Sequence, residues 1–224
     1  MSKPFISFIG CVYLTASASA GIVTFDNLPV TIGSTSSNGQ QLTVPVDGFS
    51  FTTSGTVWDS PSAWFYYNAR NSTSPSVPPA MDIGVRGTTA IFSGWYNTTY
   101  SPTSNPAYRV SRTDGSLWQF NKAFFTASWG AGTIHLIGLR DGVEVFNFTQ
   151  SISNTQQTMV SMSSYPGPAN WIDTLKISND LAVANGNRHF IMDDMYYTLP
   201  APGALALMAC GLFGIRSRRR LTVA

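Results

Sequence analysis

The feature that most constrains the fold of this 224-residue chain is a repeated alternation of apolar and polar side chains. Residues 133–139 and 143–149 show it clearly, and similar segments recur between clusters of Gly, Pro, Asn and Ser. Successive side chains of a strand point to opposite faces, so each segment is expected to bury one face. Between the two ends of the chain, no stretch has the 3.6-residue period of an amphipathic helix. The sequence therefore predicts an all-β fold, a single β-sandwich.

Tight turns are expected at Asp47-Gly48 and Asp141-Gly142, because an Asp-Gly pair between alternating segments favours a hairpin. A further turn is expected at residues 130–132. The predicted strands are 22–28, 42–46, 49–52, 64–67, 81–85, 89–95, 123–129, 133–139, 143–149, 171–177 and 189–197. The segments 69–80 and 101–107, rich in Ser, Thr and Pro, are expected to be surface loops, so residues 21–198 form one domain.

Residues 1–20 have the composition of a secretory signal peptide. Lys3 precedes an apolar segment at 5–14, and Ala18 and Ala20 provide the small residues of a cleavage site. We therefore expect export by the Sec machinery and cleavage between Ala20 and Gly21. The alternative is lipid attachment at Cys11, which follows a short apolar stretch.

The last segment, 199–224, differs in composition from the body of the chain. It contains Pro200 and Pro202, an apolar run at 204–215 and a cluster of arginines, Arg216, Arg218, Arg219 and Arg220. An apolar helix beside basic residues enters a bilayer and stops at a charged face. The run is shorter than the ~20 residues that a relaxed span needs. It therefore predicts a short helix with transient membrane contact, with a simple anchor as the alternative.

This three-part tail resembles the PEP-CTERM sorting signal of bacterial envelope proteins. The resemblance implies recognition by a membrane protease of the exosortase type and a final location at the cell surface or in the extracellular matrix. It also implies a setting of exopolysaccharide. The chain departs from the usual Pro-Glu-Pro at Ala201, which stands where the glutamate is expected.

The last 80 or so residues, ending in Phe190-Ile-Met-Asp-Asp194, are also similar to jelly-roll domains that precede such tails and, more distantly, to carbohydrate-binding modules. In those domains the first and last strands lie side by side, which here would pair residues 24–26 with 190–194. Asp26 and Asp193 would then approach each other and could share a structural calcium ion, since calcium prefers oxygen ligands. The other interpretation is that Asp193 caps a turn or bonds to a neighbouring loop.

The cysteine count and the charge exclude several classes of site. Cys11 and Cys210 lie in the two end segments, so residues 21–199 have no disulfide, thiol nucleophile or cysteine-based metal site. The same residues hold eight Lys or Arg against eleven Asp or Glu, a formal charge of −3. The body therefore has no basic footprint for nucleic acid.

The residues of the body do not favour an enzyme. Glu144 is the sole glutamate and is expected to face outward, while Asp193 and Asp194 are adjacent and would point to opposite faces of a strand. A glycoside hydrolase, which needs two facing carboxyl groups, is the less favoured interpretation. His135 and His189 are isolated from each other in sequence and are expected at surface or loop positions.

Aromatic residues gather in the first half of the chain near Ser, Thr and Asn, as a carbohydrate platform would require. Trp64 and Trp95 are the candidates for such a platform, although strand alternation sends half of the rings at 64–67 into the core. The leading prediction is a secreted, non-enzymatic component of the cell surface or matrix, without a cofactor and associated with exopolysaccharide. A carbohydrate-binding module is the alternative.

Overall fold

The computed structural model describes residues 18–28, 40–54, 56–57, 60–61, 64–67, 86, 89–93, 107–164, 171–181 and 189–201. In this part of the chain, the secondary structure is β-strands joined by turns, with one short 3-10 helix at Met162–Ser164. The predicted strand at 81–85, Trp95, Pro202 and the four arginines of the tail lie outside the described residues. The all-β prediction is confirmed.

Fourteen strands are described. They are β1 (Ser19–Val23), β2 (Gln40–Gln41), β3 (Phe49–Ser54), β4 (Thr56–Val57), β5 (Ser60–Pro61), β6 (Trp64–Tyr67), β7 (Ala90–Ser93), β8 (Ala107–Arg112), β9 (Gln119–Ala127), β10 (Gly132–Arg140), β11 (Val143–Ile152), β12 (Thr158–Ser161), β13 (Thr174–Leu181) and β14 (Phe190–Leu199).

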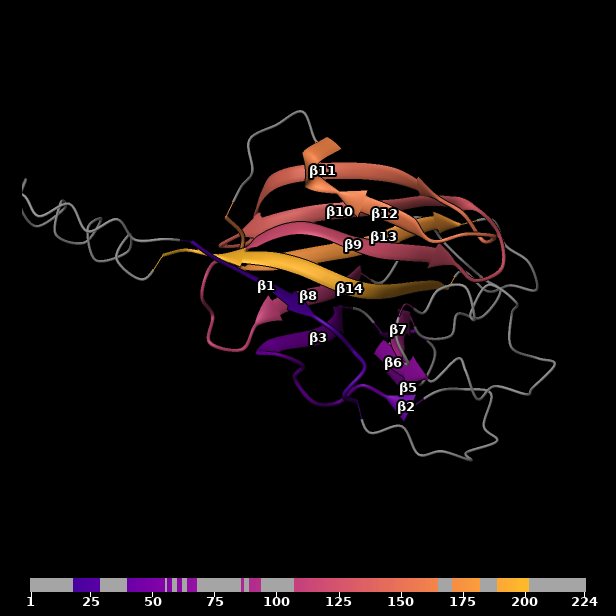
Figure 1. Ribbon diagram of the computed structural model, residues 1–224, viewed down its shortest axis with the longest axis horizontal. Helices are drawn as coiled ribbons and strands as arrows, with labels where there is room; N and C mark the ends of the chain where they lie inside the picture. The colour runs from indigo at the N-terminus through magenta and orange to yellow at the C-terminus, as the bar shows by residue number, and fades with distance from the viewer. Residues whose placement is uncertain are drawn as a thin grey trace, which may run out of the picture. The chain divides into compact units, whose positions relative to one another are not determined.

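Two antiparallel sheets form a sandwich (Figure 1). The seven-stranded sheet has the order β12-β9-β14-β7-β6-β2, with β1 also paired to β14. The five-stranded sheet has the order β11-β10-β13-β8-β3, and β4 and β5 form a separate small ribbon. The first and last strands are therefore neighbours, as the jelly-roll resemblance implied, but β1 ends at Val23, so the expected pairing of residues 24–26 with 190–194 is wrong.

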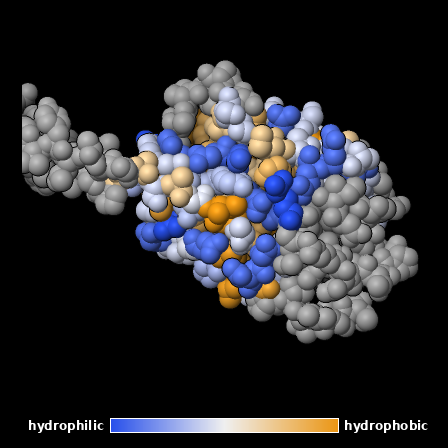
Figure 2. All heavy atoms as spheres, in the orientation of Figure 1, coloured by the Kyte–Doolittle hydropathy of each residue, from blue (hydrophilic) through white to orange (hydrophobic). Residues whose placement is uncertain are grey.

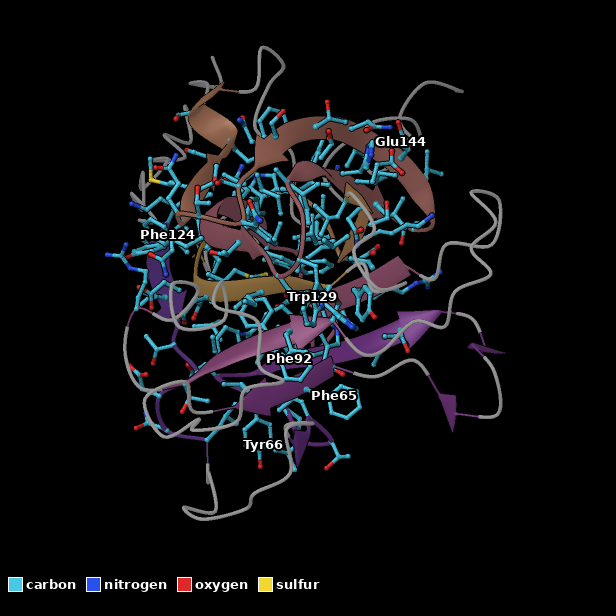
Figure 3. The ribbon with its side chains drawn as sticks, turned by 90° about the vertical axis from the view of Figure 1, so that its right-hand side faces the viewer. Phe65, Tyr66, Phe92, Phe124, Trp129 and Glu144 are labelled. Carbon is cyan, nitrogen blue, oxygen red and sulfur yellow. The ribbon has the colours of Figure 1, made fainter. Side chains whose placement is uncertain are left out.

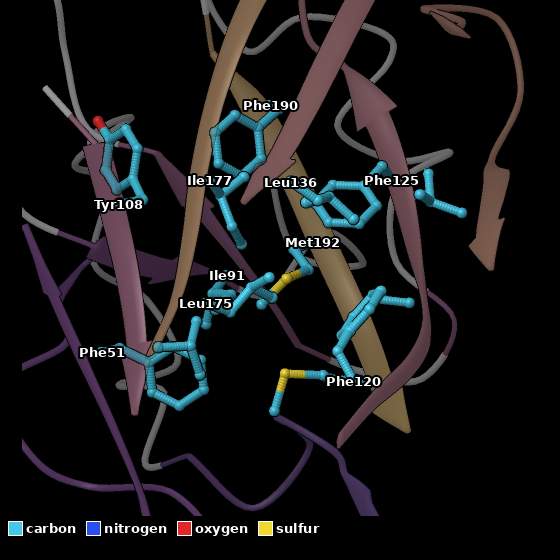
Figure 4. Packing of buried hydrophobic residues seen from close by; sticks show 14 of the residues in the cluster. Phe51, Ile91, Tyr108, Phe120, Phe125, Leu136, Leu175, Ile177, Phe190 and Met192 are labelled. Atoms are coloured by element: carbon cyan, nitrogen blue, oxygen red, sulfur yellow. The ribbon is translucent and has the colours of Figure 1, made fainter. Parts of the chain in front are cut away.

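The core lies between the facing surfaces of the two sheets (Figure 4). Successive side chains of a strand point to opposite faces, and this decides which residues enter the core. Phe190 and Met192 of β14 belong to the core, whereas Ile191 belongs to a second cluster on the opposite face. Many of the rings meet edge to face, an arrangement that aromatic pairs favour. The fold can dispense with disulfides because this apolar layer is continuous.

The two Asp-Gly turns are confirmed. Asp47 and Gly48 have φ angles of 49° and 78°, and Asp141 and Gly142 have 51° and 77°. Two successive residues with positive φ give the turn whose twist matches that of paired strands. The second turn joins β10 to β11, which pair along their length.

Some strand limits differ from the prediction. Residues 42–46 contribute only an isolated bridge at Val46, and the predicted 22–28 strand is replaced by β1, which ends at Val23. The strands β8 and β12 lie outside the predicted set. Residues 130–132 connect strands of different sheets, because β9 belongs to the larger sheet and β10 to the smaller.

Contacts divide the chain into two units, Ala20–Leu199 and a second unit made of Met1–Ser19 with Pro200–Ala224. The strand β14 ends at Leu199, immediately before Pro200, since proline cannot donate to a sheet ladder. Within the described residues, no helix has the length and hydropathy of a membrane span. The exposed large hydrophobic residues in this part are Ile22, Val44, Val143 and Met159. The face drawn in Figure 2 accordingly mixes hydrophilic and hydrophobic atoms.

Candidate ligand-binding face

The outer face of the seven-stranded sheet, opposite the core, carries an apolar row at its centre. The register aligns Thr126 of β9, Ile191 of β14, Phe92 of β7 and Phe65 of β6 on four neighbouring strands. Phe65 and Phe92 stack with ring centroids 5.5 Å apart, and Phe92 and Ile191 are buried. These rings come from strands predicted in sequence, but the row itself depends on the strand order.

A group of buried polar atoms adjoins this row and shares Thr126 with it. Within the described residues, the buried atoms Thr126 Oγ1, Ser128 Oγ, Trp129 Nε1 and Gln157 Nε2 have no hydrogen-bond partner. We call these four residues the polar cluster. Gln157 directly precedes β12, whose Thr158 pairs with Phe125, so Gln157 comes opposite Thr126. Thr126 and Ser128 are 0% and 3% exposed, whereas Trp129 and Gln157 are partly exposed.

His189 borders both the polar cluster and the apolar row. Its carbonyl oxygen accepts from the Ser128 N–H at 3.0 Å, and its ring meets Phe92 edge to face at 6.5 Å. Its Nδ1 lies 2.7 Å from the carbonyl oxygen of Ser93 and therefore carries a proton. At 3% exposure His189 is buried, so a surface position is wrong, but the residue lies in the connection directly before β14, as the loop alternative predicted. It is held there because its ring donates to the carbonyl oxygen of Ser93, the last residue of β7.

Figure 3 shows Trp129, Phe92 and Phe65 in the part of the sandwich that faces the viewer, with Glu144 set apart from them. Glu144 is exposed beside the turn that joins β10 and β11, as predicted. The face thus combines the buried ring of Phe92, the partly exposed rings of Phe65 and Trp129, a buried imidazole, and hydroxyl and amide groups.

Further along β14, three carboxylates converge on one short segment. The Asp193 carboxylate accepts from the backbone N–H of Arg86 at 2.7 Å, and Asp26 accepts from that of Thr89 at 3.1 Å. The Arg86 guanidinium donates to Asp194 at 2.9 Å and lies 3.8 Å over the ring of Phe124. Asp26 and Asp193 therefore accept hydrogen bonds from two residues of the same segment, Thr89 and Arg86. This agrees with the alternative interpretation, in which Asp193 bonds to a neighbouring loop.

A β-bulge gives Asp194 its position. Asp193 pairs with Phe124, but the next pair joins Tyr196 with Lys122, so β14 contains one extra residue there. Asp194 has a φ of 46°, and Met195 takes the following place in the core. The prediction that Asp193 and Asp194 point to opposite faces is wrong, because the bulge brings both carboxylates to Arg86.

Burial raises the pKa of Asp193 to about 7, and the neighbouring carboxylates of Asp194 and Asp26 add to this rise. The backbone N–H groups of Arg86 and Asp194 act in the opposite direction, because they stabilise the charged form. Asp193 is only 2% exposed. A carboxyl group of this kind titrates near neutral pH.

The calcium site remains a prediction. Among the described residues, no group of three His, Cys, Asp or Glu side chains is arranged to hold a metal ion. Both oxygens of Asp193 already accept N–H groups, Oδ2 from Arg86 and Oδ1 from Asp194.

Trp64 belongs to the core and not to a surface platform. It is 0% exposed, its Nε1 donates to the Thr52 carbonyl oxygen, and its ring meets Tyr108 and Phe190 edge to face. The alternation at 64–67 explains this, since Trp64 and Tyr66 face inward and Phe65 faces outward. Ala20 and Gly21 lie in β1, and their role in signal cleavage stays a prediction.

Trp129, Ser128, Gln157 and Arg86 were not among the residues singled out in sequence. Trp129 ends a predicted strand beside a glycine-rich turn, which is a signal for a residue next to a loop, where binding residues are frequent. Nothing local indicates Arg86, whose partner Asp193 is 107 residues away.

No family model matches this chain, and no curated protein matches it. Solved structures of similar arrangement exist. A DUF4465 family protein from Bacteroides ovatus is 11% identical, with 81% of this chain and 99% of that chain covered and a TM-score of 0.44. A family 29 carbohydrate-binding module from Piromyces equi is 12% identical, with 84% and 94% covered and a TM-score of 0.37. The family 11 carbohydrate-binding module of a Clostridium thermocellum cellulosomal cellulase is 9% identical, with 81% and 96% covered and a TM-score of 0.37.

Proposed function

We propose that this chain is a non-enzymatic polysaccharide-binding protein that holds sugar at the polar cluster of the seven-stranded sheet. The observation that carries the proposal is the grouping of Thr126, Ser128, Trp129 and Gln157, whose buried polar atoms have no partner among the described residues. An unpaired buried polar group costs about 1–3 kcal/mol, and native proteins contain few of them. Four in one place favour a polar ligand.

Sugar chemistry fits this set of atoms. A sugar hydroxyl both donates and accepts, so it can bond to the hydroxyls of Thr126 and Ser128 and to the N–H groups of Trp129 and Gln157. The indole ring of Trp129, which is partly exposed, offers an apolar surface beside these polar atoms. The partly exposed side chains of Trp129 and Gln157 are where the ligand enters.

The absence of an enzymatic role is part of the proposal. Asp193 has a raised pKa, as a general acid would, but its oxygens are engaged by backbone N–H groups at 2.7 and 2.8 Å. Its neighbour Asp194 is paired with Arg86. These contacts support a structural role for the carboxylates, which tie the segment before β7 to the last strand.

The test is affinity electrophoresis in gels that contain soluble neutral polysaccharides, such as a mannan, a xyloglucan and a β-glucan. Trp129→Ala should abolish the retardation that at least one polysaccharide gives with the wild-type protein. Trp171→Ala is the matched control: this tryptophan is also partly exposed, and its carbonyl oxygen is bonded by Arg140 at the other end of β10.

If no polysaccharide retards the wild-type protein, or if both variants behave like it, the proposal fails. A melting curve for each variant distinguishes lost binding from lost structure.

The cellular setting is a second part of the proposal. We propose that Sec exports the chain, that cleavage follows Ala20, and that an exosortase-type protease sorts it to the cell surface or matrix through residues 199–224. The support is the order of Pro200, Pro202, an apolar run and the arginine cluster. A surface location agrees with polysaccharide as the ligand, because exopolysaccharide is the material available there.

A further inference from the structure

Two basic side chains face each other on the opposite side of the molecule. Lys176 of β13 and Arg109 of β8 are direct partners in the register of the five-stranded sheet. Their strand neighbours Leu175, Ile177, Tyr108 and Val110 are buried in the core. Alternation therefore places Lys176 and Arg109 on the outer face of this sheet, where Arg109 is exposed and Lys176 half-buried.

This pair has no acidic partner within the described residues, where the ion pairs are Arg86–Asp194, Arg112–Asp114 and His135–Asp180. Of the acidic residues on or near the same face, Asp180 is bonded to His135 at 2.9 Å. Glu144 lies on β11, and two strands, β10 and β13, separate it from β8, the strand of Arg109. Like charges directly opposite each other on a sheet are destabilising. In a body with more acidic than basic residues, such a pair is unexpected without a ligand.

Small polar side chains surround the two cations. In the register of the sheet, Arg109 is paired on its other side with Thr52 of β3. Lys176 is paired on its other side with Ile137 of β10, which is in turn paired with Asn147 of β11. The adjacent outward positions are held by Ser50, Ser111, Thr174 and Ser178. The face is therefore an open sheet surface with hydroxyl and amide groups around two adjacent positive charges.

We infer that the outer face of the five-stranded sheet binds an anionic polysaccharide through Lys176 and Arg109. Acidic groups on successive sugars neutralise the two cations, and the surrounding Ser, Thr and Asn side chains bond to sugar hydroxyls. This surface lies on the other sheet from the polar cluster, so the inference goes beyond the proposed function. A nucleic acid fits less well, because its phosphates require a broader basic surface than two side chains.

The test is gel retardation by polygalacturonate, dextran sulfate and uncharged dextran, at low and at high salt. Wild-type protein should be retarded by polygalacturonate or dextran sulfate, not by dextran, and the effect should weaken with salt as exposed charges are screened. Arg109→Gln/Lys176→Gln should lose most of this retardation, at least a tenfold increase in Kd.

The control is Arg112→Gln/Lys122→Gln, which removes the same charge. Arg112 is paired with Asp114, and Lys122 lies over the ring of Tyr196, so neither is a free cation. This control and Trp129→Ala should keep wild-type retardation on the anionic gels. Retardation by polygalacturonate alone would assign carboxylated sugars, and retardation by dextran sulfate as well would extend the ligand to sulfated ones.

Three results would overturn the inference: wild-type protein that no anionic gel retards, an equal loss in the control, or tighter retention on duplex DNA than on either acidic polysaccharide. Stability gives an independent check. Because the cations repel each other, Arg109→Gln/Lys176→Gln should melt at the same temperature as wild type or slightly higher. A clear fall in the melting temperature would instead assign the pair to the structure of the sheet.

Discussion

Among individual residues, Asp193 has the most unusual environment. It is buried, bonded to two backbone N–H groups, and close to two further carboxylates. The sequence alone indicated an acidic pair in the last strand, and the jelly-roll resemblance indicated that Asp26 lies near it. Neither could predict Arg86, because the contact joins parts of the chain that are distant in sequence. The bulge at Asp194 was equally hidden, since it depends on the register with β9.

Asp193 should make the stability of the protein depend on pH. Its folded pKa of about 7 lies above the ordinary value of 3.8, so the folded state binds this proton more tightly than the unfolded chain. The stabilisation is complete below pH 4, is lost as the pH rises toward 7, and changes little above that. Each pKa unit corresponds to about 1.4 kcal/mol.

Thermal unfolding of wild type and Asp193→Asn at pH 4.5 to 8.5 measures this effect. As the pH rises, the melting temperature of Asp193→Asn should increase relative to that of the wild-type protein. Glu144→Gln, at an exposed carboxylate on the other sheet, should follow the wild-type profile. Parallel profiles for wild type and Asp193→Asn would show that the group does not titrate in this range.

At the scale of elements, the sequence was most informative where two neighbouring strands form a hairpin. Residues 133–139 and 143–149 alternate regularly around Asp141-Gly142, and β10 and β11 form as predicted. The assignment of each strand to one of the two sheets could not be predicted from this local alternation. The strand β8 pairs with β3 and β13, which lie far from it in sequence, and β9 leaves its neighbour β10 to join β12 and β14. These choices depend on the fit of whole apolar faces.

Gly138 illustrates a constraint between elements. A Cβ at this position would lie 2.1 Å from the Phe146 ring, at the point where the β10–β11 register shifts. Phe146 is buried in the core and has little room to move. Gly138→Ala should therefore lower the free energy of unfolding by about 1–3 kcal/mol, as overpacking of a core does.

Chemical denaturation of Gly138→Ala, Phe146→Leu and the double variant tests this contact. Because the clash is with the ring, the double variant should be more stable than the sum of the single effects predicts. Additive effects would mean that Phe146 is not what excludes a side chain at Gly138.

At the scale of the whole molecule, we propose separate tasks for the body and its ends. The unit Ala20–Leu199 contains both sheets, the polar cluster and the pair Lys176 and Arg109. The composition of the tail predicted where the body stops, because two prolines follow the last strand directly. The ligand of the body was not predictable to the same degree, since both proposed surfaces are made of residues from several strands.

Deleting residues 200–224 should leave the body intact. The two core clusters contain no residue beyond Leu199, and the one described buried side chain that the deletion removes, Ala201, belongs to neither cluster. The shortened chain should be exported, remain folded with a melting temperature within a few degrees of that of the full chain, and keep both binding activities. Unlike the full chain, it should be released into the medium, because the segment proposed for sorting is missing.

A second variant separates sorting from anchoring. Replacing Arg218, Arg219 and Arg220 with Ser keeps the apolar run but removes the charge that we propose holds its end on the cytoplasmic side. Fractionation should show impaired retention and no processing of this variant, whereas the wild-type chain becomes shorter at the membrane. Normal processing of the Ser variant would refute sorting by this tail, and unfolding of the truncated chain would show that residues 200–224 belong to the domain.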